Sequence, residues 1–154
     1  MNNHTENFAK AEMLIRKPVA EVFEAFINPA ITTRFWFTKS SGRVEPGKDL
    51  EWIWEMYNYT APVKVLSVEP NKQIVIEWGN RDEVTKVEWS FKSLEAGTFV
   101  SIINSGFKGS TDQIIAQVRD STEGFTLVLA GLKALLEHTI QLNLVSDRFP
   151  QGLT

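Results

Sequence analysis

Few side chains in this sequence belong to the types that carry nucleophilic, acid–base or metal chemistry. Cysteine is absent, which excludes disulfides, thiolate nucleophiles and cysteine-based metal sites. The only histidines are His4 and His138, near the two ends of the chain, and no Ser-His-Asp triad or histidine cluster can be assembled from them. His138 falls near the end of an expected helix, where the macrodipole explains a histidine. We expect no catalytic residue, metal or cofactor, and favour a protein that is not an enzyme.

A set of carboxylates is the remaining candidate for metal binding. These carboxylates alternate with apolar residues along expected strands, and they are Glu51, Glu55, Glu77 and Glu88. Alternation places them on the outer face of a sheet, where carboxylates are normally solubilising. The glycines at positions 106 and 109 are not followed by the Lys-Ser/Thr pair of a phosphate-binding loop.

The charge balance limits the class of partner. The formal net charge is −3 and the chain has no basic stripe, which argues against nucleic acid, because phosphate neutralisation dominates that affinity. Without a Lys/Arg cluster or a long apolar run, an anionic membrane surface and membrane insertion are also disfavoured. The first residues do not resemble a signal peptide. We expect a cytoplasmic protein whose partner is a neutral small molecule or another protein.

Apolar spacing predicts an α+β arrangement. Residues 8–15 alternate as a half-buried strand, and Pro18 opens a helix over 19–27 with apolar residues three and four apart. A second short helix is expected over 30–36. Further strands joined by short turns are expected over 37–44, 49–56, 59–68, 73–78, 84–94 and 98–104. Consecutive strands with short turns predict an antiparallel meander.

A long helix closes the chain. Ser110 and Gln113 have the spacing of a capping box, which predicts a start near Thr111. The helical period is clear from Thr122 onward, with Lys133 and Glu137 one turn apart on its exposed side. Apolar residues continue through 140–154, so that this tail either prolongs the helix, packs on the sheet or contacts a second subunit, as in a homodimer.

Short motifs connect these elements to a known family. They are the segment Arg-Lys-Pro-Val-Ala-Glu-Val-Phe-Glu-Ala-Phe at 16–26, Phe35-Trp36, Glu-Pro-Gly-Lys at 45–48, Val-Glu-Pro-Asn-Lys at 68–72, and Glu-Gly-Phe at 123–125 followed by Leu129, Leu132-Lys133 and Leu136-Glu137. In this order they resemble the START-like (SRPBCC, birch-pollen-allergen-like) superfamily, in the branch named for homology to the activator of heat-shock-protein-90 ATPase. Phe125 stands where the branch usually has Trp.

The resemblance implies one helix-grip domain over residues 1–154. In that fold a curved antiparallel sheet of six or seven strands wraps round a long C-terminal helix, two short helices follow the first strand, and an apolar cavity lies between sheet and helix.

Aromatic content supports the same cavity. Five Trp and ten Phe are many for a chain of 154 residues, and strand parity places several of them on the concave face of the sheet. Any single ring is explained by core packing, but a set of them beside one helix is typical of a ligand pocket. The expected ligand-binding residues are Phe35, Trp36, Trp52, Trp54, Tyr59, Trp78, Trp89, Phe91, Ile103, Phe125, Leu129 and Leu132.

Four polar residues are candidates to orient a ligand: Arg34, Tyr57, Tyr59 and Asn104. Each has a simpler interpretation as a solvated side chain or a turn hydrogen bond, which we favour.

The sequence thus predicts binding or transport of an apolar or aromatic small molecule. A co-chaperone-like module that activates an ATPase is the alternative that the family name suggests, although that chaperone partner is not favoured. A cyclase- or aromatase-type enzyme is a further alternative that rests on fold analogy alone.

Overall fold

The structure is a computed structural model that describes residues 7–152, so His4 lies outside the described part. Its elements are the strands β1 (Phe8–Ile15), β2 (Lys39–Ser40), β3 (Asp49–Trp54), β4 (Tyr59–Glu69), β5 (Gln73–Trp78), β6 (Thr85–Leu94) and β7 (Gly97–Ser105), the helices α1 (Val19–Ile27), α2 (Pro29–Thr32), α3 (Thr111–His138) and α4 (Leu144–Arg148), and the 3₁₀ turns η2 (Glu55–Tyr57) and η3 (Arg81–Glu83).

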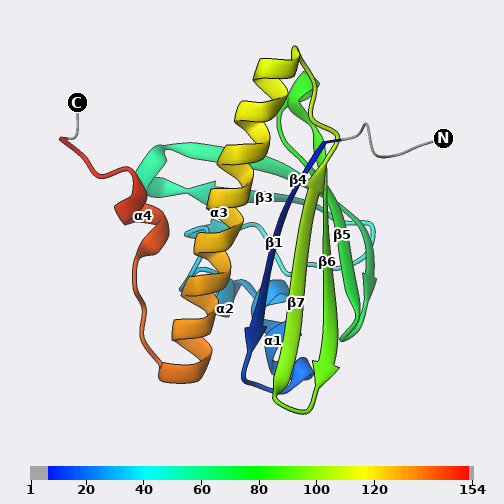
Figure 1. Ribbon diagram of the computed structural model, residues 1–154, viewed down its shortest axis with the longest axis vertical. Coiled ribbons are helices and arrows are strands. Elements are labelled where there is room, and N and C mark those ends of the chain that lie inside the picture. Colours follow the sequence, from blue (N-terminus) through cyan, green and yellow to red (C-terminus); the bar gives the residue numbers. More distant parts are fainter. Residues whose placement is uncertain (1–6, 153–154) are drawn as a thin grey trace.

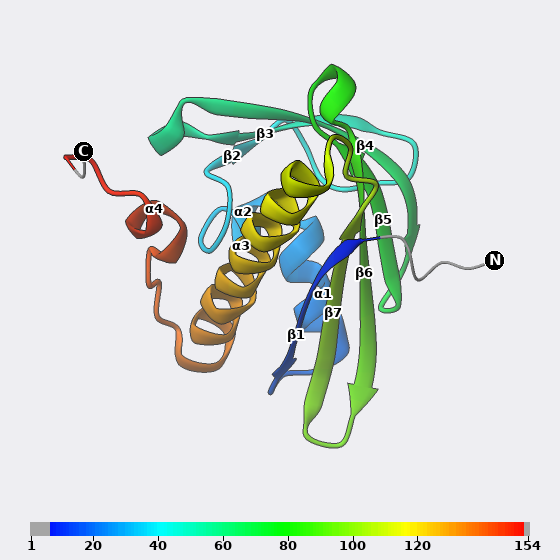
Figure 2. The ribbon, with the colours of Figure 1, turned by 45° about the horizontal axis from the view of Figure 1, so that its top comes forward.

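The strands form one antiparallel sheet in the order β1-β7-β6-β5-β4-β3-β2. The strands β2 to β7 follow one another as a meander, and β1 joins at the far edge by pairing with β7. The sheet curves round α3, with α1 and α2 at one end of the groove (Figure 1, Figure 2). A register shift between Val65 and Ser67 marks a bulge in β4, a feature that bends a strand locally. The predicted α+β helix-grip fold is confirmed.

The core lies between the concave face of the sheet and α3. In β3, Leu50, Trp52 and Trp54 are buried while Glu51 between them is exposed, as the period of two requires. The helix α3 contributes buried residues only from Phe125 onward, and none of residues 111–124 is buried. The sheet and the helix therefore pack tightly along only the C-terminal half of α3.

Two local predictions need correction. The short helix expected over 30–36 is regular only in α2, which starts at Pro29 with the Asn28 side chain accepting from the Ala30 amide at 3.0 Å. Tight turns then carry the chain to Trp36. The strand expected over 37–44 is only Lys39–Ser40, because the chain leaves β3 there and the Val44 amide donates to the Ile27 carbonyl at 3.0 Å.

The sequence placed Glu137 on the exposed side of the long helix, together with Lys133, but the structure buries most of its side chain. Its side chain is 10% exposed and accepts from the Lys133 ammonium at 2.7 Å and from the Arg16 amide at 2.8 Å. The same ammonium donates to the Leu14 carbonyl at 2.8 Å. Burial alone would raise the pKa of Glu137, but the hydrogen bonds from Lys133 and Arg16 outweigh it and hold that pKa below the usual value. This cluster ties the end of α3 to the end of β1.

No helix in residues 7–152 combines the length and the apolar character needed to cross a bilayer.

The turn between β6 and β7 provides a stability test. Gly97 has a φ of +149°, and a Cβ added there would lie 2.3 Å from the Ile15 carbonyl oxygen. Gly97→Ala should lower the free energy of unfolding by about 2–4 kcal/mol, because backbone must move to relieve the overlap. Gly124→Ala is the matched control: its Cβ would meet nothing within 4 Å, and replacing a helical glycine should raise stability by about 0.5–1 kcal/mol. Urea denaturation of both variants measures this, and an unaffected Gly97→Ala protein would contradict the close approach of β1 to β7.

The cluster at Glu137 predicts a pH dependence. Because the pKa of Glu137 is lowered on folding, its contribution is complete above the unfolded-chain value of about 4.3 and is lost as the pH falls through the lower folded-state pKa. Glu137→Gln should therefore destabilise the protein by about 1–2 kcal/mol at neutral pH, and the difference from wild type should shrink on acidification below about pH 4.3. Denaturant melts across that range measure it; a constant difference would show that the carboxylate charge is not involved.

Candidate functional site

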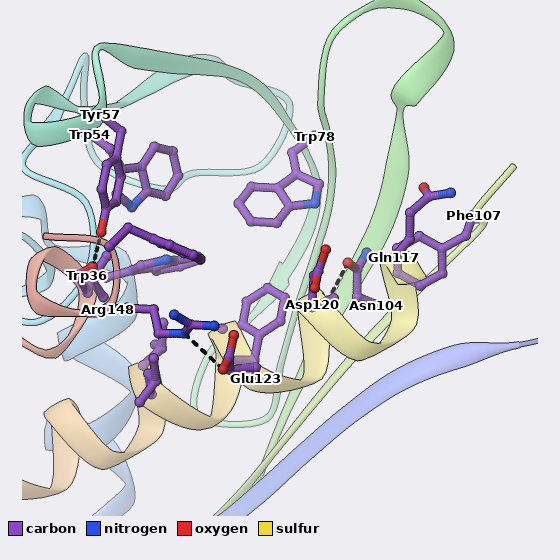
Figure 3. A pocket seen from close by; sticks show the side chains of 17 residues that line it. Trp36, Trp54, Tyr57, Trp78, Asn104, Phe107, Gln117, Asp120, Glu123 and Arg148 are labelled. Atoms are coloured by element: carbon purple, nitrogen blue, oxygen red, sulfur yellow. Dashed lines mark hydrogen bonds and ion pairs between the residues drawn. The ribbon is translucent and has the colours of Figure 1, made fainter. Parts of the chain in front are cut away.

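A cavity of about 680 Å³ lies beside the loosely packed half of α3 (Figure 3). It falls within the roughly 300–1,000 Å³ typical of small-molecule sites. Its lining comes from the ends of β3, β5 and β7, from η2, α3 and α4, and from the loops beside α2, β7 and α4. It consists of Trp36, Trp54, Tyr57, Trp78, Asn104, Phe107, Gln117, Asp120, Ser121, Glu123, Gly124, Phe125, Leu127, Val128, Val145, Arg148 and Phe149.

Four aromatic rings, each in contact with at least two of the others, form the inner wall. The ring of Trp36 lies 6.1 Å from that of Trp54, 5.8 Å from that of Trp78 and 5.7 Å from that of Phe125, between centroids. Trp78 and Phe125 are also 5.8 Å apart. These separations and their mostly tilted or edge-on angles are the favourable arrangements for aromatic pairs. The wall is therefore apolar and fixed before any ligand arrives.

Trp36 reaches this wall because of the corner between α1 and α2. The Thr32 hydroxyl is buried and donates toward the Ala25 carbonyl at 2.6 Å and the Asn28 carbonyl at 3.0 Å. The Trp36 amide then donates to the Thr32 carbonyl at 3.0 Å. A buried hydroxyl that satisfies its hydrogen bond in this way locks the corner and sets the position of the indole.

A small polar network interrupts the apolar lining at one end. The Asn104 amide nitrogen donates to the Thr85 hydroxyl at 2.9 Å and the Lys86 carbonyl at 2.8 Å, and its oxygen accepts from Ser121 at 2.8 Å. The Trp78 indole donates to the same Thr85 hydroxyl at 3.1 Å. Asn104 is 3% exposed, so these bonds offset its burial and tie β6, β7 and α3 together.

The tail does not prolong α3: α4 packs against α3 and contributes to the cavity lining, while contact of the tail with a second subunit stays a prediction. After α3 ends at His138 the chain returns along that helix to α4 (Figure 1), and Val145 and Arg148 of α4 line the cavity. The Tyr57 hydroxyl donates to the Val145 carbonyl, and the Arg148 guanidinium pairs with Glu123 at 2.9 Å. The Phe149 ring lies 6.1 Å from that of Tyr57. The partly buried hydrogen bond from Tyr57 and the exposed Arg148–Glu123 ion pair hold α4 in place.

The structure brings only part of the predicted site to this cavity. The predicted residues that line it are Trp36, Trp54, Trp78 and Phe125. Those that instead fill the closed core are Phe35, Trp52, Trp89, Phe91, Leu129 and Leu132, because parity predicts the face of the sheet but not the depth at which a ring is covered. Tyr59 is 45% exposed outside the cavity. Ile103 lies on the opposite face from the buried Ile102 and Asn104, so its assignment to the pocket is corrected.

Among the polar candidates, Tyr57 and Asn104 line the cavity and Arg34 does not. Sequence reasoning missed the lining from α4 and from the polar turns of α3: Gln117, Asp120, Glu123, Val145, Arg148 and Phe149. The apolar residues of the tail indicated that this segment packs against something, but they did not indicate that it packs beside the cavity.

Known proteins share the sequence motifs and the fold of this chain. The family model described as "Activator of Hsp90 ATPase homolog 1-like protein" matches residues 16–137. The solved structure of SSP2350 from Staphylococcus saprophyticus is 31% identical, with a TM-score of 0.77 over 88% of this chain and 96% of that one.

Two other solved structures share the fold at lower identity. MLL2253 from Mesorhizobium loti is 21% identical, with a TM-score of 0.77 over 87% of this chain and 99% of that one. The Aha1 dimer from Colwellia psychrerythraea is 19% identical, with a TM-score of 0.73 over 86% and 97%. No curated protein is significantly similar to the chain.

The closure by α4 is testable through one hydroxyl. Tyr57→Phe keeps the ring but removes the hydrogen bond to Val145, which should favour opening of α4 by about 0.5–1.5 kcal/mol, or two- to tenfold. Hydrogen exchange of the backbone amides in 144–149 measures this opening. Tyr59→Phe is the control, because the Tyr59 hydroxyl makes no hydrogen bond within residues 7–152; equal exchange in the two variants would contradict the role of Tyr57.

Proposed function

The chain belongs to the family of Activator of Hsp90 ATPase homolog 1-like proteins, and from that premise we propose that it binds or transports an apolar or aromatic small molecule in its internal cavity. The observation that carries the proposal is the wall of four contacting aromatic rings around about 680 Å³ of space. Such a volume accepts a molecule of two or three fused rings, and a preformed wall minimises the cost of ordering side chains on binding.

The expected affinity is modest and comes from burial. A flat aromatic molecule that buries about 350 Å² of apolar surface gains about 9 kcal/mol, from which association costs of about 4 kcal/mol or more are subtracted. We therefore expect dissociation constants of about 0.2 mM or weaker for generic aromatic probes, and tighter binding for a physiological ligand that also uses the polar lining.

The burial of the aromatic rings favours small-molecule binding over an interface that activates an ATPase. Aromatic anchors of protein–protein interfaces must reach the partner, whereas Trp36, Trp54 and Phe125 are at most 7% exposed. An activity of the co-chaperone type would need a different surface of the molecule.

The proposal is tested by titrating the protein with N-phenyl-1-naphthylamine, a neutral dye that brightens in apolar surroundings. Wild type should give saturable binding, and Trp78→Ala should weaken it about tenfold, because a wall of the cavity is lost. Ile103→Ala is the control, since Ile103 lies on the opposite face of the sheet. Variants are compared only where circular dichroism shows the fold intact. Equal affinity of Trp78→Ala and wild type would contradict binding at this site.

A further inference from the structure

The charged residues that line the cavity are not balanced. They are Asp120 and Glu123 from α3 and Arg148 from α4. Glu123 is paired with Arg148 at 2.9 Å, whereas no Lys, Arg or His nitrogen in residues 7–152 lies within 4.0 Å of the Asp120 carboxylate. The lining therefore carries one carboxylate without a cation beside it.

The position of Asp120 relates this charge to the aromatic wall. Asp120 lies one turn before Glu123 on α3, and its side chain points toward Trp78 (Figure 3). We call the part of the lining formed by Asp120, Glu123 and Arg148 the mouth of the cavity. Gln117 and Ser121 are its neighbours in the lining, and both are neutral. A positively charged group that entered beside Trp78 would thus meet a free carboxylate and an electron-rich ring face together.

Arg148 already exhibits this mode of recognition within the chain. Its guanidinium lies 4.3 Å from the centroid of the Phe149 ring while it pairs with Glu123. A cation over an aromatic face, with a carboxylate at its other side, gains from the ring quadrupole and from the ion pair. The mouth thus accommodates one protein cation in this way and has a second carboxylate and a second set of rings available.

We propose that the ligand of this cavity is an aromatic or hydrophobic amine, whose apolar body lies against Trp36, Trp78 and Phe125 and whose ammonium group pairs with Asp120. This inference rests on the proposed function of the cavity and specifies the class of molecule that it takes. Anionic ligands are disfavoured, because their charge would meet Asp120 at the mouth.

Three probes with the same ring system separate the contribution of the ligand's charge from that of its apolar body. They are 2-(naphthalen-1-yl)ethylamine, 2-(naphthalen-1-yl)ethanol and naphthalen-1-ylacetate. Affinities are measured by NMR chemical-shift titration of the full chain at neutral pH. The amine should bind about three- to tenfold more tightly than the alcohol, and the acetate more weakly than both. The advantage of the amine should decrease between low salt and about 0.5 M salt, because an ion pair at the mouth is screened.

Asp120→Asn should remove the advantage of the amine and leave the affinity for the alcohol unchanged. Glu95→Gln is the charge-matched control, because Glu95 is exposed in the turn between β6 and β7 and is not part of the lining. Equal binding of amine and alcohol, or an amine affinity unaffected by Asp120→Asn, would overturn the inference while the proposed function stands. Binding of none of the three probes would overturn the proposed function and this inference with it.

Discussion

The constraint on which the molecule depends is that a strongly curved sheet offers more concave surface than one helix can cover. In α3 the buried residues begin at Phe125, and the preceding fourteen positions, 111–124, contain none. From Phe125 onward the apolar side chains of α3 close the core, whereas residues 111–124 bury none of their side chains and touch the sheet through the Ser121–Asn104 hydrogen bond. The cavity is the space beside the half of α3 that buries no side chains. The distribution of apolar residues along α3 therefore explains both the packed core at its C-terminal half and the cavity beside its N-terminal half.

Aromatic side chains are the means by which such a space stays open without collapse. Trp36, Trp54 and Trp78 come from a loop and from the ends of two strands, and each contacts the others. Large rigid rings supply much area with few rotatable bonds, and the corner locked by Thr32 and the network around Asn104 hold them from behind. The cavity is thus a property of the packing around it.

The sequence was sufficient for the features that depend on local periodicity. Alternation in β3 and the helical period from Thr122 predicted which faces are buried, and the switch at Thr122 coincides with the point where α3 begins to pack. Depth was not predictable: Trp52 and Trp89 share the concave face with Trp54 and Trp78, yet only the latter pair lines the cavity. The position of α4 was not predictable either, because it depends on a hydrogen bond from Tyr57 to a carbonyl 88 residues away.

Native mass spectrometry of the purified protein, compared with its denatured mass, tests the central claim most directly. The account predicts that the folded 17.5 kDa chain carries additional mass that is released on denaturation, or takes up one equivalent of an added aromatic amine. The released molecule would identify the ligand class. A folded protein that has only the mass of its own chain, both as purified and after incubation with excess probe, would contradict the claim that this space is a binding site.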